Sequence, residues 1–93
     1  MNERESNIIY IRFYLGDEQI AYISISKIDF VSDLINKFAL AVDWKKEDLN
    51  NYKFIYSGKS LEPSLSVYES GLLHNSIIYL KRKKQIIGGY SPY

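Results

Sequence analysis

Hydrophobic and polar residues alternate along two stretches near the start of the chain, and both are typical of β-strands. In residues 8–15, Ile9, Ile11 and Phe13 fall on one face and the side chains between them fall on the other. Residues 20–26 alternate in the same way. Because only a short segment with one glycine separates the two stretches, they are predicted to form a β-hairpin.

The period of the pattern changes after this hairpin, and the new spacing predicts a helix. Asp29 is the expected N-cap residue, since its carboxylate can accept hydrogen bonds from the amides of the first turn. The apolar residues that follow recur at helical spacing: Val31, Leu34, Ile35, Phe38 and Val42. The helix is therefore expected over residues 30–42.

Two further strands are predicted in the second half of the chain. Residues 52–56 alternate and end at a Ser57–Gly58 turn, and residues 76–81 alternate again. Residues 60–61 are expected to pair briefly with another strand. A helix that crosses one face of a mixed sheet can bury both apolar faces in a single core. The expected fold class is therefore α+β, a roll in which a mixed sheet of four to five strands packs on one central helix.

Length and patterning indicate a single domain. A chain of 93 residues has room for one core, and the strand and helix patterns place the domain at residues 8–81. Residues 1–7 are polar, without the apolar region of a signal peptide, and are expected to be a flexible leader. The pattern ends after residue 81, so residues 82–93 are expected to be a flexible tail.

Composition and charge exclude several function classes. The sequence has no cysteine, so disulfides, thiolate metal sites and cysteine nucleophiles are excluded. The formal net charge of +1 provides no overall field that would attract nucleic acid or a membrane. No apolar stretch is long enough to span a bilayer. We therefore expect a monomeric, cytoplasmic protein that does not contact membranes.

One histidine and one basic run remain as candidates for chemistry. His74 has no Cys, Asp or Glu at ligand spacing and no nucleophile that it could activate. Neither a metal site, nor a catalytic site, nor a cofactor site is therefore predicted. Residues 81–84 (Lys-Arg-Lys-Lys) could contact nucleic acid, an import receptor or an acidic groove on an enzyme. No stripe of aromatic and basic residues accompanies this run, so no specific nucleic-acid partner is expected.

Residues 29–38, 54–62 and 71–80 together resemble the ubiquitin-like proteins, a family with the β-grasp fold. Residues 29–38 (Asp-Phe-Val-Ser-Asp-Leu-Ile-Asn-Lys-Phe) resemble the opening of the family's helix, and residues 71–80 (Gly-Leu-Leu-His-Asn-Ser-Ile-Ile-Tyr-Leu) resemble its last turn and strand. Residues 54–62 (Phe-Ile-Tyr-Ser-Gly-Lys-Ser-Leu-Glu) resemble the family segment Leu-Ile-Phe-x-Gly-Lys-x-Leu-Glu. Order and spacing match over residues 8–89, and the matching region ends at Gly88–Gly89.

The resemblance implies a role for the glycine pair in protein modification. In modifiers of this family the carboxylate of the last glycine, here Gly89, is activated by ATP, transferred to an enzyme thiol and joined to a lysine amine. Gly88 and Gly89 have no side chains that would obstruct the catalytic groups. Because Tyr90 follows Gly89, residues 90–93 are expected to be a propeptide. The implied partners are activating and conjugating enzymes, a processing or deconjugating protease, and target proteins, and the chain itself is not expected to be an enzyme.

The resemblance also implies a surface for partner binding. Ile55 matches the centre of the family's recognition patch, and the expected contacts around it are Gly58, Tyr79 and Lys81. Lys81 stands where the family usually has a small apolar residue, so this patch is expected to be smaller and more charged than that of ubiquitin. Lys59 matches a chain-linkage lysine of ubiquitin, and Lys37 matches a less used one.

Two alternatives to a covalent modifier remain open. The chain could be a non-covalent binding module that uses Ile55 and the tyrosines expected on the outer sheet face, which are Tyr10, Tyr14, Tyr22 and Tyr79. Tyrosine provides contact area at low entropic cost, although it also simply suits the solvent-facing side of a strand. A sulfur carrier ending in a Gly-Gly thiocarboxylate is less favoured, because the glycines of such carriers usually end the chain.

Overall fold

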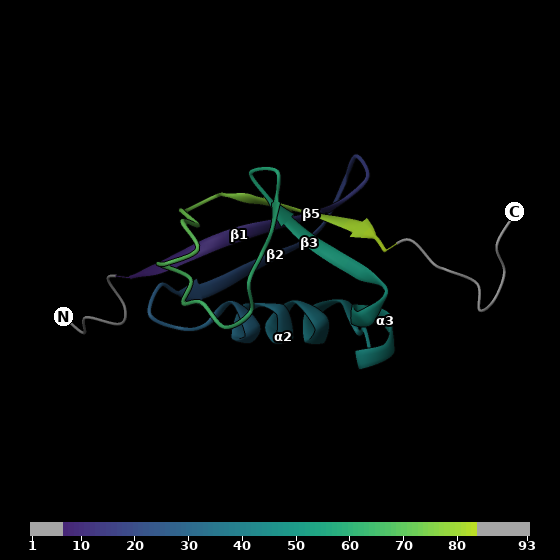
Figure 1. Ribbon diagram of the computed structural model, residues 1–93, viewed down its shortest axis with the longest axis horizontal. Coiled ribbons are helices and arrows are strands. Elements are labelled where there is room, and N and C mark those ends of the chain that lie inside the picture. Colours follow the sequence, from purple (N-terminus) through teal and green to yellow (C-terminus); the bar gives the residue numbers. More distant parts are fainter. Residues whose placement is uncertain (1–6, 84–93) are drawn as a thin grey trace, which may run out of the picture.

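Five strands form one mixed sheet, and helix α2 crosses one face of it (Figure 1). The computed structural model describes residues 7–83. In chain order the elements are β1 (Ile8–Leu15), β2 (Glu18–Ser26), α2 (Val31–Val42), α3 (Lys46–Asn50), β3 (Tyr52–Tyr56), β4 (Lys59–Ser60) and β5 (Ile77–Arg82). The strand order across the sheet is β2-β1-β5-β3-β4. The predicted α+β class, with the sheet packed on one central helix, is confirmed.

The N-terminal hairpin forms where the alternation predicts it. β1 and β2 pair antiparallel, with Ile11 opposite Ile23, and both side chains are buried. β2 begins at Glu18, two residues before the predicted start at residue 20. The turn can be this short because Gly16 adopts a φ of 62°, a conformation that glycine reaches without a steric cost.

The last strand completes the sheet by lying between the two halves of the chain. β5 runs parallel to β1, with Ile78 beside Phe13, and antiparallel to β3, with Leu80 opposite Phe54. These four side chains are buried on the helix side of the sheet. The side chains between them therefore point away from α2. We call the face of the sheet opposite α2 the outer face (Figure 1).

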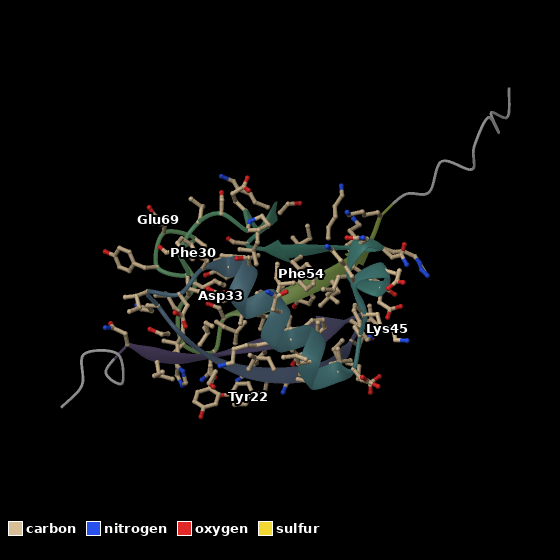
Figure 2. All side chains as sticks on the ribbon, turned by 90° about the horizontal axis from the view of Figure 1, so that it is seen from below. Tyr22, Phe30, Asp33, Lys45, Phe54 and Glu69 are labelled. Carbon is tan, nitrogen blue, oxygen red and sulfur yellow. The ribbon has the colours of Figure 1, made fainter. Side chains whose placement is uncertain are left out.

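The start of α2 differs from the prediction. Phe30, and not Asp29, is the N-cap residue, and the helix begins at Val31. The Val31 amide donates to the Leu65 carbonyl at 2.9 Å, while the Asp33 carboxylate accepts from the Phe30 amide at 3.0 Å. Figure 2, which shows the helix side, places Phe30 and Asp33 together at this end of α2. The prediction of an Asp29 cap is wrong because the loop before β5 supplies an acceptor from a distant part of the sequence.

An aromatic cluster joins α2 to the sheet. Phe38 is fully buried and stacks on Phe13, with a distance of 4.4 Å between ring centroids. Its ring also meets Phe54 at 5.7 Å and Trp44 at 5.3 Å, both in edge-to-face geometry. Trp44 in turn stacks on Tyr52 at 5.0 Å. Because one ring contacts β1, β3 and Trp44 in the link after α2, Phe38 is central to the packing of the core.

A turn in the loop before β5 is closed by two reciprocal hydrogen bonds. The Ser66 amide donates to Glu69 Oε1 at 3.0 Å, and the Glu69 amide donates to Ser66 Oγ at 3.0 Å. Hydrogen bonding to Ser66 lowers the pKa of the Glu69 carboxyl below its ordinary value. The bond with the Ser66 backbone has the larger effect, and the bond with the Ser66 side chain has the smaller one. Hydrogen bonds that stabilise the charged form have this effect. The negative charge of Glu69 therefore helps to hold this turn together.

Ser66→Ala is expected to raise the pKa of Glu69 towards its ordinary value, because the variant lacks one of the two partners that lower it. Since the lowered pKa belongs to the folded state, the stability contributed by Glu69 is present above its unfolded pKa and is lost as the pH falls through the folded pKa. NMR titration of the Glu69 carboxyl carbon measures the shift. Ser64→Ala, in the same loop but without a contact to Glu69, is the control, and an equal shift in that variant would contradict this explanation.

Candidate functional site

The predicted recognition residues come from β3, β5 and the turn after β3. In the antiparallel register Ile55 lies directly opposite Tyr79, and Lys53 lies opposite Lys81. Phe54 and its partner on β5 point into the core, so these four side chains share the outer face. The structure thus brings Ile55, Tyr79 and Lys81 to neighbouring positions.

Gly58 contributes the shape of this region. It has a φ of 83° in the turn between β3 and β4, and the turn returns the chain so that Ser60 pairs with Ile55. A shallow hollow results, lined by Lys53, Ile55, Gly58, Ser60, Lys81 and Arg82. We call Ile55, Gly58, Tyr79 and Lys81 the Ile55 surface. Its apolar part is small and is bordered by the cationic side chains of Lys53, Lys81 and Arg82.

The four tyrosines expected on the outer face are there, and they form two pairs. Tyr10 stacks on Tyr22 with 5.0 Å between ring centroids, and Tyr14 lies 5.8 Å from Tyr79 in a tilted arrangement. The second pair includes Tyr79, so the tyrosines continue from the Ile55 surface across β1 to β2. Contact area on this face therefore extends well beyond Ile55.

Two residues that the sequence did not mark as functional hold the first tyrosine pair. The Tyr10 amide donates to His74 Nδ1 at 3.2 Å, and the Asn75 amide donates to the Tyr10 carbonyl at 2.7 Å. The Tyr22 hydroxyl donates to Asn75 Oδ1 at 2.6 Å. Asn75 has a φ of 68°, which asparagine tolerates better than most residues. The available signal was an asparagine just before the predicted last strand, but its hydrogen-bond partners could not be read from the sequence.

The two candidate linkage lysines have different environments. Lys59 lies on the edge strand β4 and is exposed. Lys37 lies on α2, where its Nζ donates to the Ser24 carbonyl of the other edge strand at 2.6 Å. An attack by the Lys37 amine would first require this hydrogen bond to break, so the geometry favours Lys59 as the more available amine.

The predicted processing and conjugation residues lie outside the described residues. These are Gly88 and Gly89, and the same holds for residues 90–93 and for all but the last residue of the predicted leader, 1–7. The described chain ends just after β5, where the Lys83 amide donates to the Asn51 carbonyl at 2.9 Å. Lys83 is thus tied to the turn between α3 and β3.

The helix side of the molecule, opposite the Ile55 surface, carries an apolar groove that was not predicted from the sequence. It has a volume of about 670 Å³ and lies between α2, α3 and β3. Its apolar lining includes Ile35, Leu40, Trp44, Leu49 and Phe54, and Leu40 is 83% exposed. The signal in the sequence was Leu40, an apolar residue that shares one face of the helix with the polar Asn36 and Lys37.

Among residues 7–83, no group of three or more His, Cys, Asp or Glu side chains could hold a metal ion. Over the same part of the chain, no helix is long and apolar enough to cross a membrane.

Solved ubiquitin-like structures have the same arrangement of strands and helix. The ubiquitin-like domain of yeast Ddi1 has a TM-score of 0.70 at 17% sequence identity, over 85% of this chain and 93% of that one. A ubiquitin-like domain from Arabidopsis thaliana has a TM-score of 0.69 at 19% identity, over 85% and 81%. A designed protein based on ubiquitin has a TM-score of 0.69 at 17% identity, over 88% and 96%.

The comparisons define the class of fold. No protein-family model matches the sequence, and no curated protein matches it significantly. The structural likeness nevertheless extends over most of this chain and most of each compared chain. The protein has the ubiquitin-like β-grasp fold, as the three resembling segments predicted.

Proposed function

We propose that this chain is the precursor of a ubiquitin-like protein modifier, cut after Gly89 and joined through the Gly89 carboxylate to amines of target proteins. The observation that carries the proposal is the position of Gly88–Gly89 in a chain with this fold. Gly89 lies seven residues beyond Arg82, the end of β5 (89 − 82). The pair therefore follows the last strand closely, at the place where a modifier's reactive end is required.

The proposed chemistry consists of successive acyl transfers. Hydrolysis of the Gly89–Tyr90 peptide bond by a protease frees the Gly89 carboxylate. The carboxylate attacks the α-phosphate of ATP and displaces pyrophosphate, which gives an acyl-adenylate. An enzyme thiolate then displaces AMP, and a lysine amine finally displaces the thiolate. The chain is the group that is transferred, and catalysis belongs to its activating enzyme, conjugating enzyme and processing or deconjugating protease.

The Ile55 surface is the proposed docking site for those partners, and Lys59 is the proposed lysine for chain linkage. Support for the first comes from the adjacency of Ile55 and Tyr79 and from the hollow beside Gly58. Support for the second comes from the exposed position of Lys59 and the engaged amine of Lys37. The cytoplasm is the proposed location, since the chemistry needs ATP and reduced enzyme thiols.

The experiment that tests this function is the intact mass of the protein from its native cells, together with a search for conjugates. A mature form ending at Gly89 and attached to lysines supports the proposal. A protein that retains Tyr90–Tyr93 and forms no conjugates contradicts it.

A non-covalent binding module is the second candidate, and the continuity of Ile55 with the tyrosine pairs favours it. If it is correct, Ile55→Asp is expected to weaken partner capture about tenfold or more, since a charge would be placed at the centre of the contact. Removal of residues 84–93 is then expected to have no effect. The measurement is the affinity for the partner recovered with the wild-type protein. Leu40→Asp, on the helix side, is the matched control, and equal loss in that variant would contradict a role for the outer face. A sulfur carrier is less favoured.

A further inference from the structure

Among the described residues, the outer face of the sheet combines tyrosine rings with cationic side chains and carries no carboxylate. Its cations are Arg12, Lys53 and Lys81, which lie between or beside the tyrosine pairs in the strand register. Glu18 is the only acidic residue in the five strands, and it pairs with Leu15 at the end of the hairpin, in the inward register. Within residues 7–83 none of the three cations forms an ion pair with a carboxylate.

The charge on this face is a local property that the net charge of the chain conceals. The formal net charge is only +1 because acidic residues balance the basic ones. In the described part of the chain, the remaining acidic residues lie in turns, in loops and on the helices, at positions 17, 29, 33, 43, 47, 48, 62 and 69. The outer face thus presents three positive charges to a partner, and these compensating acidic residues lie outside the strands.

We propose that the outer face binds single-stranded nucleic acid without recognising its sequence. Unpaired bases stack on exposed aromatic rings, and phosphates pair with neighbouring cations. The rings are accessible, since Tyr10, Tyr22 and Tyr79 are 41%, 47% and 49% exposed. Arg12 lies between Tyr10 and Tyr14 on β1, where it can contact a phosphate that links bases stacked at the two pairs.

The dimensions of the face suit an extended strand of nucleotides. Tyr10 and Tyr14 are four residues apart on β1, which corresponds to about 13 Å along a strand. From Tyr14 the register continues to Tyr79 and Ile55, and Lys53 and Lys81 follow beside them. A path along which rings and cations alternate therefore crosses the sheet from β2 to β3.

The first tyrosine pair is held in place before any ligand arrives. The Tyr22 hydroxyl donates to Asn75 Oδ1. The Tyr10 amide donates to His74 Nδ1, and the Tyr10 carbonyl accepts from the Asn75 amide. Such preorganisation lowers the entropic cost of binding.

The exposed rings favour an unpaired strand over the other anions that three cations could attract. In a duplex the base faces are covered by their neighbours, so the tyrosines would have nothing to stack on. An acidic peptide would use the cations but would leave the rings without aromatic partners. Because only three phosphates are contacted, the affinity is expected to be weak and the dependence on salt modest.

Fluorescence anisotropy with the full chain tests this proposal. The probes are labelled oligouridine and oligodeoxythymidine of about 12 nucleotides, within the usual site size of about 4–16. Saturable binding is expected at low salt, and the slope of log K against log salt is expected to be about −2, since each phosphate contact on a single strand contributes about −0.7. A labelled duplex of equal length is expected to bind more weakly.

Variants separate the contributions of rings and charges. Tyr79→Leu and Tyr10→Leu keep an apolar side chain but remove the ring, and each is expected to weaken binding about tenfold. Arg12→Gln is expected to reduce the salt slope by about 0.7. The matched controls are Tyr68→Leu, a 71% exposed tyrosine in the loop before β5, and Lys45→Gln at the start of α3. Neither control is expected to change the affinity or slope.

Several outcomes would overturn the proposal. These are the absence of saturable binding to both oligonucleotides at low salt, equal or tighter binding of the duplex, and an unchanged affinity in the leucine variants. Competition by polyglutamate that is as strong as competition by unlabelled oligonucleotide would indicate a general anion site instead. If a tyrosine variant does not fold, as judged by circular dichroism, the salt dependence of Arg12→Gln decides. A slope of log K against log salt in Arg12→Gln that equals the wild-type slope overturns the proposal.

Discussion

Gly89→Ala is expected to reduce attachment of the protein to its targets about 100-fold, in cells that supply the cognate enzymes. The added Cβ lies next to the carbonyl carbon at which every acyl transfer occurs. It displaces the approaching catalytic groups, and a misplacement of ~1 Å can cost about 100-fold in rate. The measurement is the amount of high-mass conjugate formed by a tagged full-length chain, compared with the amount of free chain.

Ser91→Ala is the matched control for this effect. Ser91 belongs to the segment that the proposed protease removes, so its replacement is expected to leave the conjugate level at that of the wild type. Persistence of conjugates after both Gly88 and Gly89 are replaced would refute attachment through this end of the chain.

Phe38→Ala is expected to destabilise the fold by about 3–5 kcal/mol, the usual cost of removing a buried aromatic ring. The ring is fully buried and contacts Phe13, Phe54 and Trp44, so the cavity would open between α2 and the sheet. A domain of this size has a total stability of about 5 kcal/mol or somewhat more. The variant is therefore expected to retain only about 0–2 kcal/mol of stability, which places it close to its unfolding midpoint at room temperature.

Phe30→Ala tests whether burial, and not residue type, is responsible. Phe30 is 51% exposed at the start of α2, and its replacement is expected to cost less than about 1 kcal/mol. Urea unfolding monitored by circular dichroism measures both variants. Equal destabilisation by the two substitutions would contradict the central place of Phe38 in the core.

Patterns within single elements predicted most of the fold. The bounds of β1 and β3 agree with the alternation in the sequence, because each strand has one buried face and a one-residue shift would expose it. The helix was also located within one residue. Its cap was not, since the first amide of α2 bonds to Leu65, and contacts between distant segments leave no local pattern.

For the site, the sequence predicted only which residues of one strand share a face of the sheet. Alternation placed Tyr10, Tyr14, Tyr22 and Tyr79 on the outer face, but strand order decided which rings meet. For the same reason no aromatic–basic stripe was visible in the sequence. The tyrosines and cations of the outer face come from β1, β2, β3 and β5. The two halves of this set meet only because β5 lies parallel beside β1.

Lys37 and Lys59 show the same limit of prediction from the sequence. The sequence marks both as lysines at linkage positions, while the environment of each amine depends on tertiary structure. Lys37 donates to the Ser24 carbonyl of β2, and this contact requires α2 to pack against the sheet next to β2. Lys59 lies on the opposite edge of the sheet.

The most direct test of the central claim is mass spectrometry of the protein isolated from its native cells. The predicted result is an intact species that ends at Gly89, together with conjugates on lysines of other proteins. Because Lys84 is the last basic residue before the glycines, trypsin would leave Gln-Ile-Ile-Gly-Gly, residues 85–89, on each modified lysine. A single species that retains Tyr90–Tyr93, with no lysine carrying this remnant, would contradict the modifier function and favour the non-covalent binding module.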